Sequence, residues 1–235
     1  MSLLNHLKLY ATQEHSCSYD KTKQATTLFV DPDVEVNDVI YRELTDIGFR
    51  RSGKHFYRPH CRSCNDCIAT RIPVERVSLT KKQKRIIKKN SDVLCRQVDS
   101  IDSDEHYHLF EQYIAKRHSD GDMYPATREQ YREFLVDGND FSHYTEFRLN
   151  DQLIAVNLAD KIVNGLSAIY TFFDTEHARR SLGNFAILEL IEETRRLGGD
   201  FLYLGYWISH CQKMNYKIDY RPMELLINGS WKRLG

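Results

Sequence analysis

The sequence lacks the features that would place it in a membrane or in a secreted class. Its longest apolar runs, such as 166–173 and 201–208, are about eight residues, well short of the roughly 18 that a membrane-spanning helix needs. Residues 1–8 hold no apolar signal-peptide core, and the chain contains no internal repeat or low-complexity tract. We therefore expect a protein that stays in the cytoplasm and has no membrane partner.

An excess of charge of one sign is also missing, because 33 basic residues balance 33 acidic ones. The balance hides a split: residues 1–100 carry 18 Lys or Arg against 12 Asp or Glu, whereas residues 101–235 carry 15 against 21. Between Arg50 and Asn90 there are 13 basic residues and only two acidic ones. A polyanion such as RNA is the natural partner of this stretch, and a solvated basic face is the alternative.

What remains is an ordinary globular composition. Charged residues make up 28% and hydrophobic residues 41% of the chain, which excludes a disordered tail, a collagen-like fibre and a coiled-coil rod. The length of 235 residues allows one or two domains with a real hydrophobic core.

Three of the six cysteines form a compact group. The run Cys61-x-x-Cys64-x-x-Cys67 can turn three thiolates toward one centre, which predicts a metal site. The fourth ligand would be the remote Cys17 or the adjacent His60, and zinc and an iron-sulfur cluster are both compatible. The alternative is a set of free or redox-active thiols. A disulfide framework is not expected in a cytosolic chain of this length.

Hydrophobic periodicity predicts an α+β protein. Helical spacing and capping residues predict helices over 37–49, 81–89, 104–116, 127–136 and from about 184 to 198. Strands are predicted over 26–31, 55–58, 68–74, 93–98, 143–149, 153–160, 165–173 and 201–205. The Asn150-Asp151 pair predicts a hairpin turn. We place an N-terminal lobe at residues 1–100 and a second domain at 101–235.

The segment 179–184 joins a strand to a helix in a distinctive way. Free backbone N–H groups at this helix start, together with Arg179 and Arg180, would hold a phosphate or an oxyanion, and a simple helix cap is the alternative. Antiparallel strands followed by such a turn, a helix and another strand resemble the acyl-CoA N-acetyltransferase (GNAT) fold and its aminoacyl-transferring relatives. The expected architecture is thus a C-terminal GNAT-like mixed sheet with flanking helices, plus a smaller cysteine-containing lobe.

Motifs along nearly the whole chain resemble the arginyl-tRNA–protein transferases, and in particular their bacterial leucyl-transferring branch. They are Cys17-Ser-Tyr19, 48–53 (GFRRSG), 57–61 (YRPHC) with Cys64 and Cys67, 71–74 (RIPV), 170–174 (YTFFD), 180–183 (RSLG), 203–208 (YLGYWI), 211–217 (CQKMNYK) and 220–222 (YRP). One position departs from the eukaryotic pattern: Asp20 stands where those relatives have a further cysteine, which leaves the ligand set of a metal open.

The resemblance implies transfer of an aminoacyl group from charged tRNA to the α-amine of proteins that begin with Asp or Glu, which marks them for degradation. The branch with Cys-x-x-Cys-x-x-Cys is expected to add leucine, from leucyl-tRNA. No cofactor is required for the transfer itself. The metal expected with the resemblance, zinc or an iron-sulfur cluster, would be held by Cys17, Cys61, Cys64 and Cys67 in a structural or regulatory role.

The chemistry of such a transfer needs little acid–base help. The donor ester is already activated, and the acceptor amine has a pKa of roughly 7.7–8.0, so positioning and support of the oxyanion suffice. No nucleophile–His–acid motif is visible, and Cys211 and His210, being adjacent in sequence, would not face each other. A general base, if one is used, would be Asp160, Asp174 or His210.

Binding residues follow from charge and motif position. Expected tRNA contacts are Arg50, Arg51, Lys54, Tyr57, Arg58, Lys81, Lys82, Lys84, Arg85, Lys88 and Lys89. Expected aminoacyl and acceptor contacts are Arg179, Arg180, Ser181, Gly183, Cys211, Lys213, Tyr216, Lys217 and Arg221. For each of these cations a structural salt bridge is the alternative. Two competing hypotheses are an acetyl-CoA-dependent acetyltransferase and a non-catalytic metal-ribbon RNA-binding protein.

Overall fold

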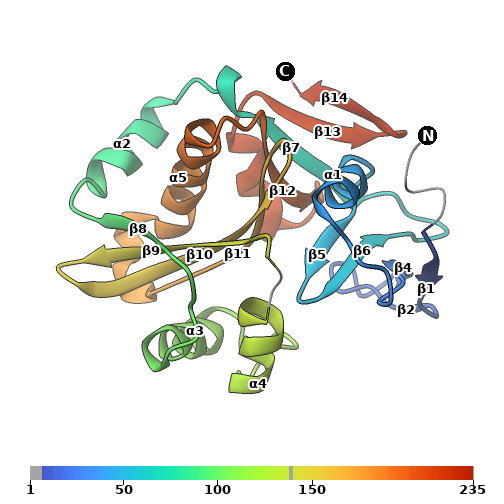
Figure 1. Cartoon of the computed structure of the whole chain (residues 1–235), viewed down its shortest axis with the longest axis horizontal. Coiled ribbons are helices and arrows are strands. Elements are labelled where there is room, and N and C mark those ends of the chain that lie inside the picture. The colour runs from blue at the N-terminus through green and yellow to red at the C-terminus, as the bar shows by residue number, and fades with distance from the viewer. Residues whose placement is uncertain (1–6, 138–139, 235) are drawn as a thin grey trace.

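The computed structural model describes residues 7–137 and 140–234 and is built around one eight-stranded sheet (Figure 1). The strand order is β14-β13-β7-β12-β11-β10-β9-β8. Neighbouring strands are antiparallel except β11 and β12, which pair in parallel. The bounds are β7 Ile68–Pro73, β8 Leu94–Val98, β9 Ser142–Leu149, β10 Gln152–Ile162, β11 Gly165–Phe173, β12 Phe201–Trp207, β13 Met223–Ile227 and β14 Ser230–Leu234.

The N-terminal part of the described chain adds a second, four-stranded sheet in the order β1-β4-β6-β5, a two-stranded β2-β3 pair and helix α1. In Figure 1 these elements lie together at one side of the large sheet. Their bounds are β1 Leu9–Ala11, β2 His15–Ser16, β3 Gln24–Ala25, β4 Thr27–Val30, α1 Asp38–Asp46, β5 Arg50–Ser52 and β6 His55–Pro59.

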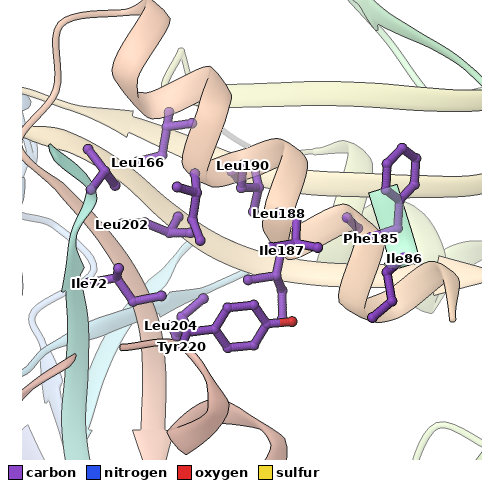
Figure 2. Packing of buried hydrophobic residues seen from close by; sticks show 14 of the residues in the cluster. Ile72, Ile86, Leu166, Phe185, Ile187, Leu188, Leu190, Leu202, Leu204 and Tyr220 are labelled. Carbon is purple, nitrogen blue, oxygen red and sulfur yellow. The ribbon is translucent and has the colours of Figure 1, made fainter. Parts of the chain in front are cut away.

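Helices cover both faces of the large sheet. Helix α5 packs on one face, where its Ile187 and Leu190 join a core with Leu166 of β11, Leu202 of β12 and Ile86 of α2 (Figure 2). Helices α3 and α4 pack on the opposite face, in a second core. The helical bounds are η2 Val74–Arg76, α2 Lys81–Lys89, α3 Asp104–Arg117, α4 Arg128–Tyr131, η3 Arg132–Val136, η4 Thr175–Arg180, α5 Leu182–Arg196 and η5 Gln212–Asp219.

Local sequence signals account for most of these boundaries. The Thr80 hydroxyl accepts from the backbone N–H of Gln83, and the Gln83 side chain returns the bond, so α2 begins as predicted. Asn37 caps α1 in the same manner with its side-chain oxygen. Asn150 and Asp151 both adopt positive φ, 49° and 65°, which is the backbone of the predicted two-residue hairpin turn.

Several predicted elements differ in extent from the structure. The helix expected over 37–49 ends at Asp46, and Gly48, with φ of +90°, follows its C-cap Ile47. The helix expected over 127–136 is α-helical only to Tyr131 and continues as the π-turn η3. The strand expected over 201–205 extends to Trp207. The β13–β14 hairpin and strands β1 to β3 were not predicted, because their two to five residues give too little alternation to detect.

The large mixed sheet with helices on both faces confirms that part of the predicted α+β architecture. Strands β7 and β8 come from the first 100 residues, yet both belong to the large sheet. The domain boundary at residue 100 therefore stays a prediction, and the two segments meet inside one sheet.

A buried ion pair fixes the small sheet on the large one. Arg51 of β5 donates to both carboxylate oxygens of Asp160 on β10 at 2.6 Å, and the side chains of both residues are 0% exposed. The Tyr41 hydroxyl of α1 donates to the same carboxylate at 2.5 Å. Because β5 and α1 both donate to this one carboxylate on β10, the position of β5 relative to the large sheet depends on it.

We expect the change Arg51→Met to lower the free energy of unfolding by about 3–5 kcal/mol, because it leaves the Asp160 carboxylate buried without its partner. The double change Arg51→Met/Asp160→Leu should recover most of that loss, since an apolar pair of similar volume leaves no buried charge. Urea unfolding measures both. A single-variant loss no larger than that of Asp120→Asn, which breaks the exposed pair with Lys213, would contradict this role for the ion pair.

Candidate active site

The parallel strands β11 and β12 diverge within the large sheet. They pair only from Gly165↔Phe201 to Ser167↔Tyr203, although β11 continues to Phe173 and β12 to Trp207. Beyond that point the facing backbone carbonyls have no partner strand. We call this opening between the two strands the β11–β12 split.

Two basic side chains from other elements fill the β11–β12 split. Arg50 of β5 donates through Nη2 to the Ala168 carbonyl on β11, and Lys217 of η5 donates through Nζ to the Tyr206 carbonyl on β12. Gly205, with φ of +75°, lies beside both: a Cβ there would stand 3.6 Å from the Arg50 Nε and 3.8 Å from the Lys217 Nζ. The two cations therefore converge on one point of β12.

Both cations are buried, at 6% exposure for Arg50 and 7% for Lys217. Burial and the nearby Arg50 guanidinium lower the pKa of Lys217 to about 7. The Arg50 Nη1 atom is buried without a hydrogen-bond partner, as are the Tyr170 hydroxyl of β11 and the indole Nε1 of Trp207 on β12. Of these three groups, only the Arg50 Nη1 belongs to the cation pair at the split, which therefore keeps an unused hydrogen-bond donor.

A basic surface lies at the start of α5, which follows β11. The Lys89 Nζ of α2 donates to the Arg179 carbonyl at 2.8 Å, and Asn90 donates to the Arg180 carbonyl at 2.9 Å. Helix α2 thereby carries its lysines to the turn that precedes α5. We call the combination of α2 and the segment 179–181 the α2–α5 basic surface.

The α2–α5 basic surface joins two groups of predicted site residues that are about 90 positions apart in sequence. Lys81, Lys84, Arg85 and Lys88 are exposed, while Lys82 also pairs with Asp219 at 3.0 Å. Arg180 is engaged with Asp92, at 2.7 and 2.9 Å, so it holds the turn in place. Ser181 takes the left-handed conformation, with φ of +55°. Gly183, in the first turn of α5, lies next to the Phe173 ring.

The predicted metal ligands share one cavity. Cys17, Cys61, Cys64 and Cys67 line a cavity of about 310 Å³ together with His210, whereas His60 is exposed and is not part of its lining. The salt bridge between Lys23 and Asp66, 2.7 Å long, ties the β2–β3 loop to the cysteine turn.

Without a bound cation, the surroundings of that cavity disfavour the thiolate form of its cysteines. Burial and the three neighbouring cysteines raise the pKa of Cys67 to about 12. The residues gather soft ligands in one place, but within 7–137 and 140–234 no three candidate ligands stand in metal-holding geometry. Four cysteine sulfurs are ligands that a thiophilic metal prefers, and they would have to move closer together to bind one.

Other predicted site residues take structural positions. Arg51 and Asp160 lie in the buried ion pair, so neither faces a surface that tRNA or substrate can reach. Asp174 caps η4 by accepting from the Glu176 N–H at 2.9 Å. This geometry leaves His210, in the cysteine cavity, as the one member of the predicted general-base set without a structural role among the described contacts.

Of the aromatic and basic residues predicted to bind tRNA near β5 and β6, some are packed against other side chains and one is exposed. Tyr57 packs against Tyr206, with ring centroids 6.3 Å apart, and Arg58 donates to the Ile47 carbonyl while lying over the Phe49 ring. Lys54 is exposed in the turn between β5 and β6, and Figure 1 shows these two strands away from α2. The tRNA contacts predicted at 50–58 therefore do not form one surface with α2.

The acceptor candidates on and after η5 differ in exposure. Lys213 pairs with Asp120 at 3.2 Å on the surface, and Arg221 donates to the Ile218 carbonyl at 2.9 Å. Tyr216 is partly exposed beside Lys217, whose Nζ lies 6.0 Å from its ring centre. Cys211 is half-buried. The sequence gives no sign that Arg50 lies beside Lys217, because nothing in its pattern shows that the side chain of Arg50 on β5 reaches the split.

Comparison with known proteins gives full-length relatives. Family models of the arginine-tRNA-protein transferase match residues 15–85 with its N terminus and residues 105–227 with its C terminus. The aspartate/glutamate leucyltransferase of Stutzerimonas stutzeri (strain A1501) is 53% identical over 234 residues, covering 100% of both chains. That of Pseudomonas fluorescens (strain Pf0-1) is 52% identical over 231 residues, covering 98% of both.

Among solved structures, L-PGS from Bacillus licheniformis superposes with a TM-score of 0.48 and 9% identity, over 86% of this chain and 69% of that one. In the described residues, no helix has both the length and the apolar character to cross a membrane. The matches to both halves of one family model, and the identity of about half of all residues to full-length relatives, establish that this chain belongs to the arginine-tRNA-protein transferase family.

Proposed function

We propose that the protein transfers leucine from leucyl-tRNA to the α-amine of proteins that begin with Asp or Glu, and so marks them for degradation. The observation that carries this proposal is the full-length identity of 53% to a leucyltransferase, over both family-model regions. The protein would accordingly work in the cytoplasm.

The reaction is an aminolysis of an ester. The neutral α-amine of the acceptor attacks the leucyl carbonyl, a peptide bond forms, and the tRNA 3′-terminal ribose leaves as the free hydroxyl. The acceptor amine has a pKa of roughly 7.7–8.0, so a usable fraction is neutral at cellular pH. The protein's contribution is to hold both substrates in line and to exclude water from the ester.

We place the tRNA on the α2–α5 basic surface, with its 3′ end entering the β11–β12 split. The exposed lysines of α2 and the N–H groups at the start of α5 lie on the approach to that split, because only the short turn that contains η4 separates the end of β11 from the start of α5. Duplex phosphates would contact α2, and the single-stranded end, which bears leucine, would pass the α5 N-terminus.

The finer fold that this proposal implies is a GNAT-like aminoacyltransferase. Diverging parallel strands with a helix between them, as in β11-α5-β12, support it. A donor built on coenzyme A is disfavoured, since the turn offers Gly183 followed by Asn184 rather than a fuller glycine-rich loop. A metal-ribbon RNA-binding protein is also disfavoured, because β6 and β7, which flank the cysteine turn, belong to different sheets of one packed structure.

We expect radiolabelled leucine to pass from leucyl-tRNA to peptides that begin with Asp or Glu, and not to peptides that begin with Lys or Ala. Arginyl-tRNA offered under the same conditions is the matched donor control. Modification of Lys-initiated peptides alone would contradict the acceptor assignment, and donation by arginyl-tRNA alone would contradict the leucyl assignment.

We expect the triple change Lys81→Ala/Lys84→Ala/Lys88→Ala to weaken tRNA binding by at least about tenfold at low salt, because three phosphate contacts are lost. The slope of log Kd against log salt should fall by roughly two to three units, and equally for different tRNAs, since phosphates carry no sequence information. The other two predicted lysines, Lys82 and Lys89, are left intact because they hold intramolecular bonds.

The control for this experiment is a triple alanine variant at Lys21, Lys161 and Lys232, which are exposed on other elements. It removes the same net charge. Equal losses of affinity and slope in the two variants would show that α2 makes no particular contact.

We also propose that Cys17, Cys61, Cys64 and Cys67 hold one zinc ion or iron-sulfur cluster in a structural role. Their shared cavity supports the proposal, and a cation bound there would favour the thiolate form of each cysteine. The site ties the β2–β3 loop to the turn between β6 and β7. No step of the transfer depends on it.

Anaerobic purification followed by elemental analysis should find close to one equivalent of zinc, or iron with sulfide. Each single Cys→Ser change in the set of four should lower that content, whereas Cys95→Ser, on β8 in the large sheet, should leave it unchanged. A metal-free protein that is folded and active when prepared anaerobically would leave the cysteines as free thiols.

A further inference from the structure

Arg50 and Lys217 form a pair of buried cations that lacks a counter-ion. Their side chains donate to backbone carbonyls on opposite strands of the β11–β12 split, and burial together with the nearby Arg50 guanidinium lowers the pKa of Lys217. Within residues 7–137 and 140–234, neither cation forms a salt bridge with an Asp or Glu. Burying two like charges side by side is costly unless an anion joins them.

The free hydrogen-bonding capacity of this pair points in the same direction. The Arg50 Nη1 is buried and makes no hydrogen bond, although guanidinium groups that deep in a protein are normally satisfied. Arg50 thus offers one unused donor group, and Lys217 has N–H groups beyond the one given to the Tyr206 carbonyl. Together they can take up one oxyanion.

From this geometry we infer that Arg50 and Lys217 bind the side-chain carboxylate of the acceptor's first residue, and so select Asp or Glu. The inference rests on the proposed function and adds the residues that give it acceptor specificity. A carboxylate is the end of a side chain, so it can meet a cation pair with only one face occupied by the rest of its own chain. A phosphodiester has a sugar on each side, and the exposed lysines of α2 suit it better.

The arrangement also explains how binding of the acceptor's side-chain carboxylate positions its reacting α-amine. The carboxylate and the α-amine of an N-terminal Asp are separated by only two carbon atoms, so a cation pair in the split fixes the amine within the split too. A residue with a neutral side chain of the same shape, such as Asn, would leave both cations unpaired, and leaving buried charges unpaired is strongly unfavourable.

The test compares kcat/KM for two peptides that differ only in an N-terminal Asp or Asn, with leucyl-tRNA as donor. Wild-type protein should favour Asp strongly. In Lys217→Met and in Arg50→Met, the ratio of the two values should fall by roughly 10- to 100-fold, the effect of losing one charge-assisted hydrogen-bonding partner. Because the ratio is taken within each variant, a general loss of activity or of folded protein cancels.

Lys213→Met is the matched control, since Lys213 lies on the same 3₁₀ segment but pairs with Asp120 on the surface; its ratio should equal that of wild type. Lys217→Arg keeps the charge and should retain most of the preference. Thermal unfolding of each variant reports whether the fold is intact.

An unchanged Asp/Asn ratio in Lys217→Met and Arg50→Met, with both peptides slowed equally, would overturn the inference and assign the cations to the donor. Wild-type protein that modifies neither peptide would instead overturn the proposed function, and the inference with it. The two failures are therefore distinguishable in one set of measurements.

Discussion

The buried ion pair between Arg51 and Asp160 is the interaction on which the rest of this structure depends. It joins β5 of the small sheet to β10 of the large one, and Tyr41 of α1 adds a third element to the same carboxylate. Side chains alternate along a strand, so with Arg51 fixed toward β10, the preceding Arg50 must point elsewhere. In this structure it reaches the Ala168 carbonyl at the β11–β12 split. The structural Arg51 thereby positions the preceding residue, Arg50, at the candidate site.

The large sheet supplies the other half of the site. Because β11 and β12 pair over only three residues, the carbonyls beyond Ser167 and Tyr203 are open to side chains from other segments. Helix α5, wedged over one face, carries α2 and its lysines to the same end of the split. The exposed α2–α5 basic surface suits phosphates, and the cation pair of Arg50 and Lys217 is buried. This combination suits a reaction between a polyanionic donor and an acidic acceptor.

Much of this could be predicted from local sequence, and the rest depends on contacts between distant residues. The caps at Asn37 and Thr80, the turn at Asn150-Asp151 and the alternation in β9 to β11 each act within a few residues, so their elements were predicted correctly. Arg50, Arg51 and Lys89 have the same charge in the sequence, yet they lie in the split, in the core and on the surface. Only the packing of β5 on β10 and β11 separates these roles, and Asp160, 109 positions from Arg51, gives no local sign of its partner.

The most direct test of this account is a crystal structure of the protein with a peptide that begins with Asp and a non-hydrolysable leucyl-adenosine analogue. We expect the Asp side-chain carboxylate to accept hydrogen bonds from Arg50 and Lys217, and the peptide amine to face the leucyl carbonyl between β11 and β12. A carboxylate held instead by Arg180 or Lys213, with Arg50 and Lys217 still bound only to the Ala168 and Tyr206 carbonyls, would contradict it.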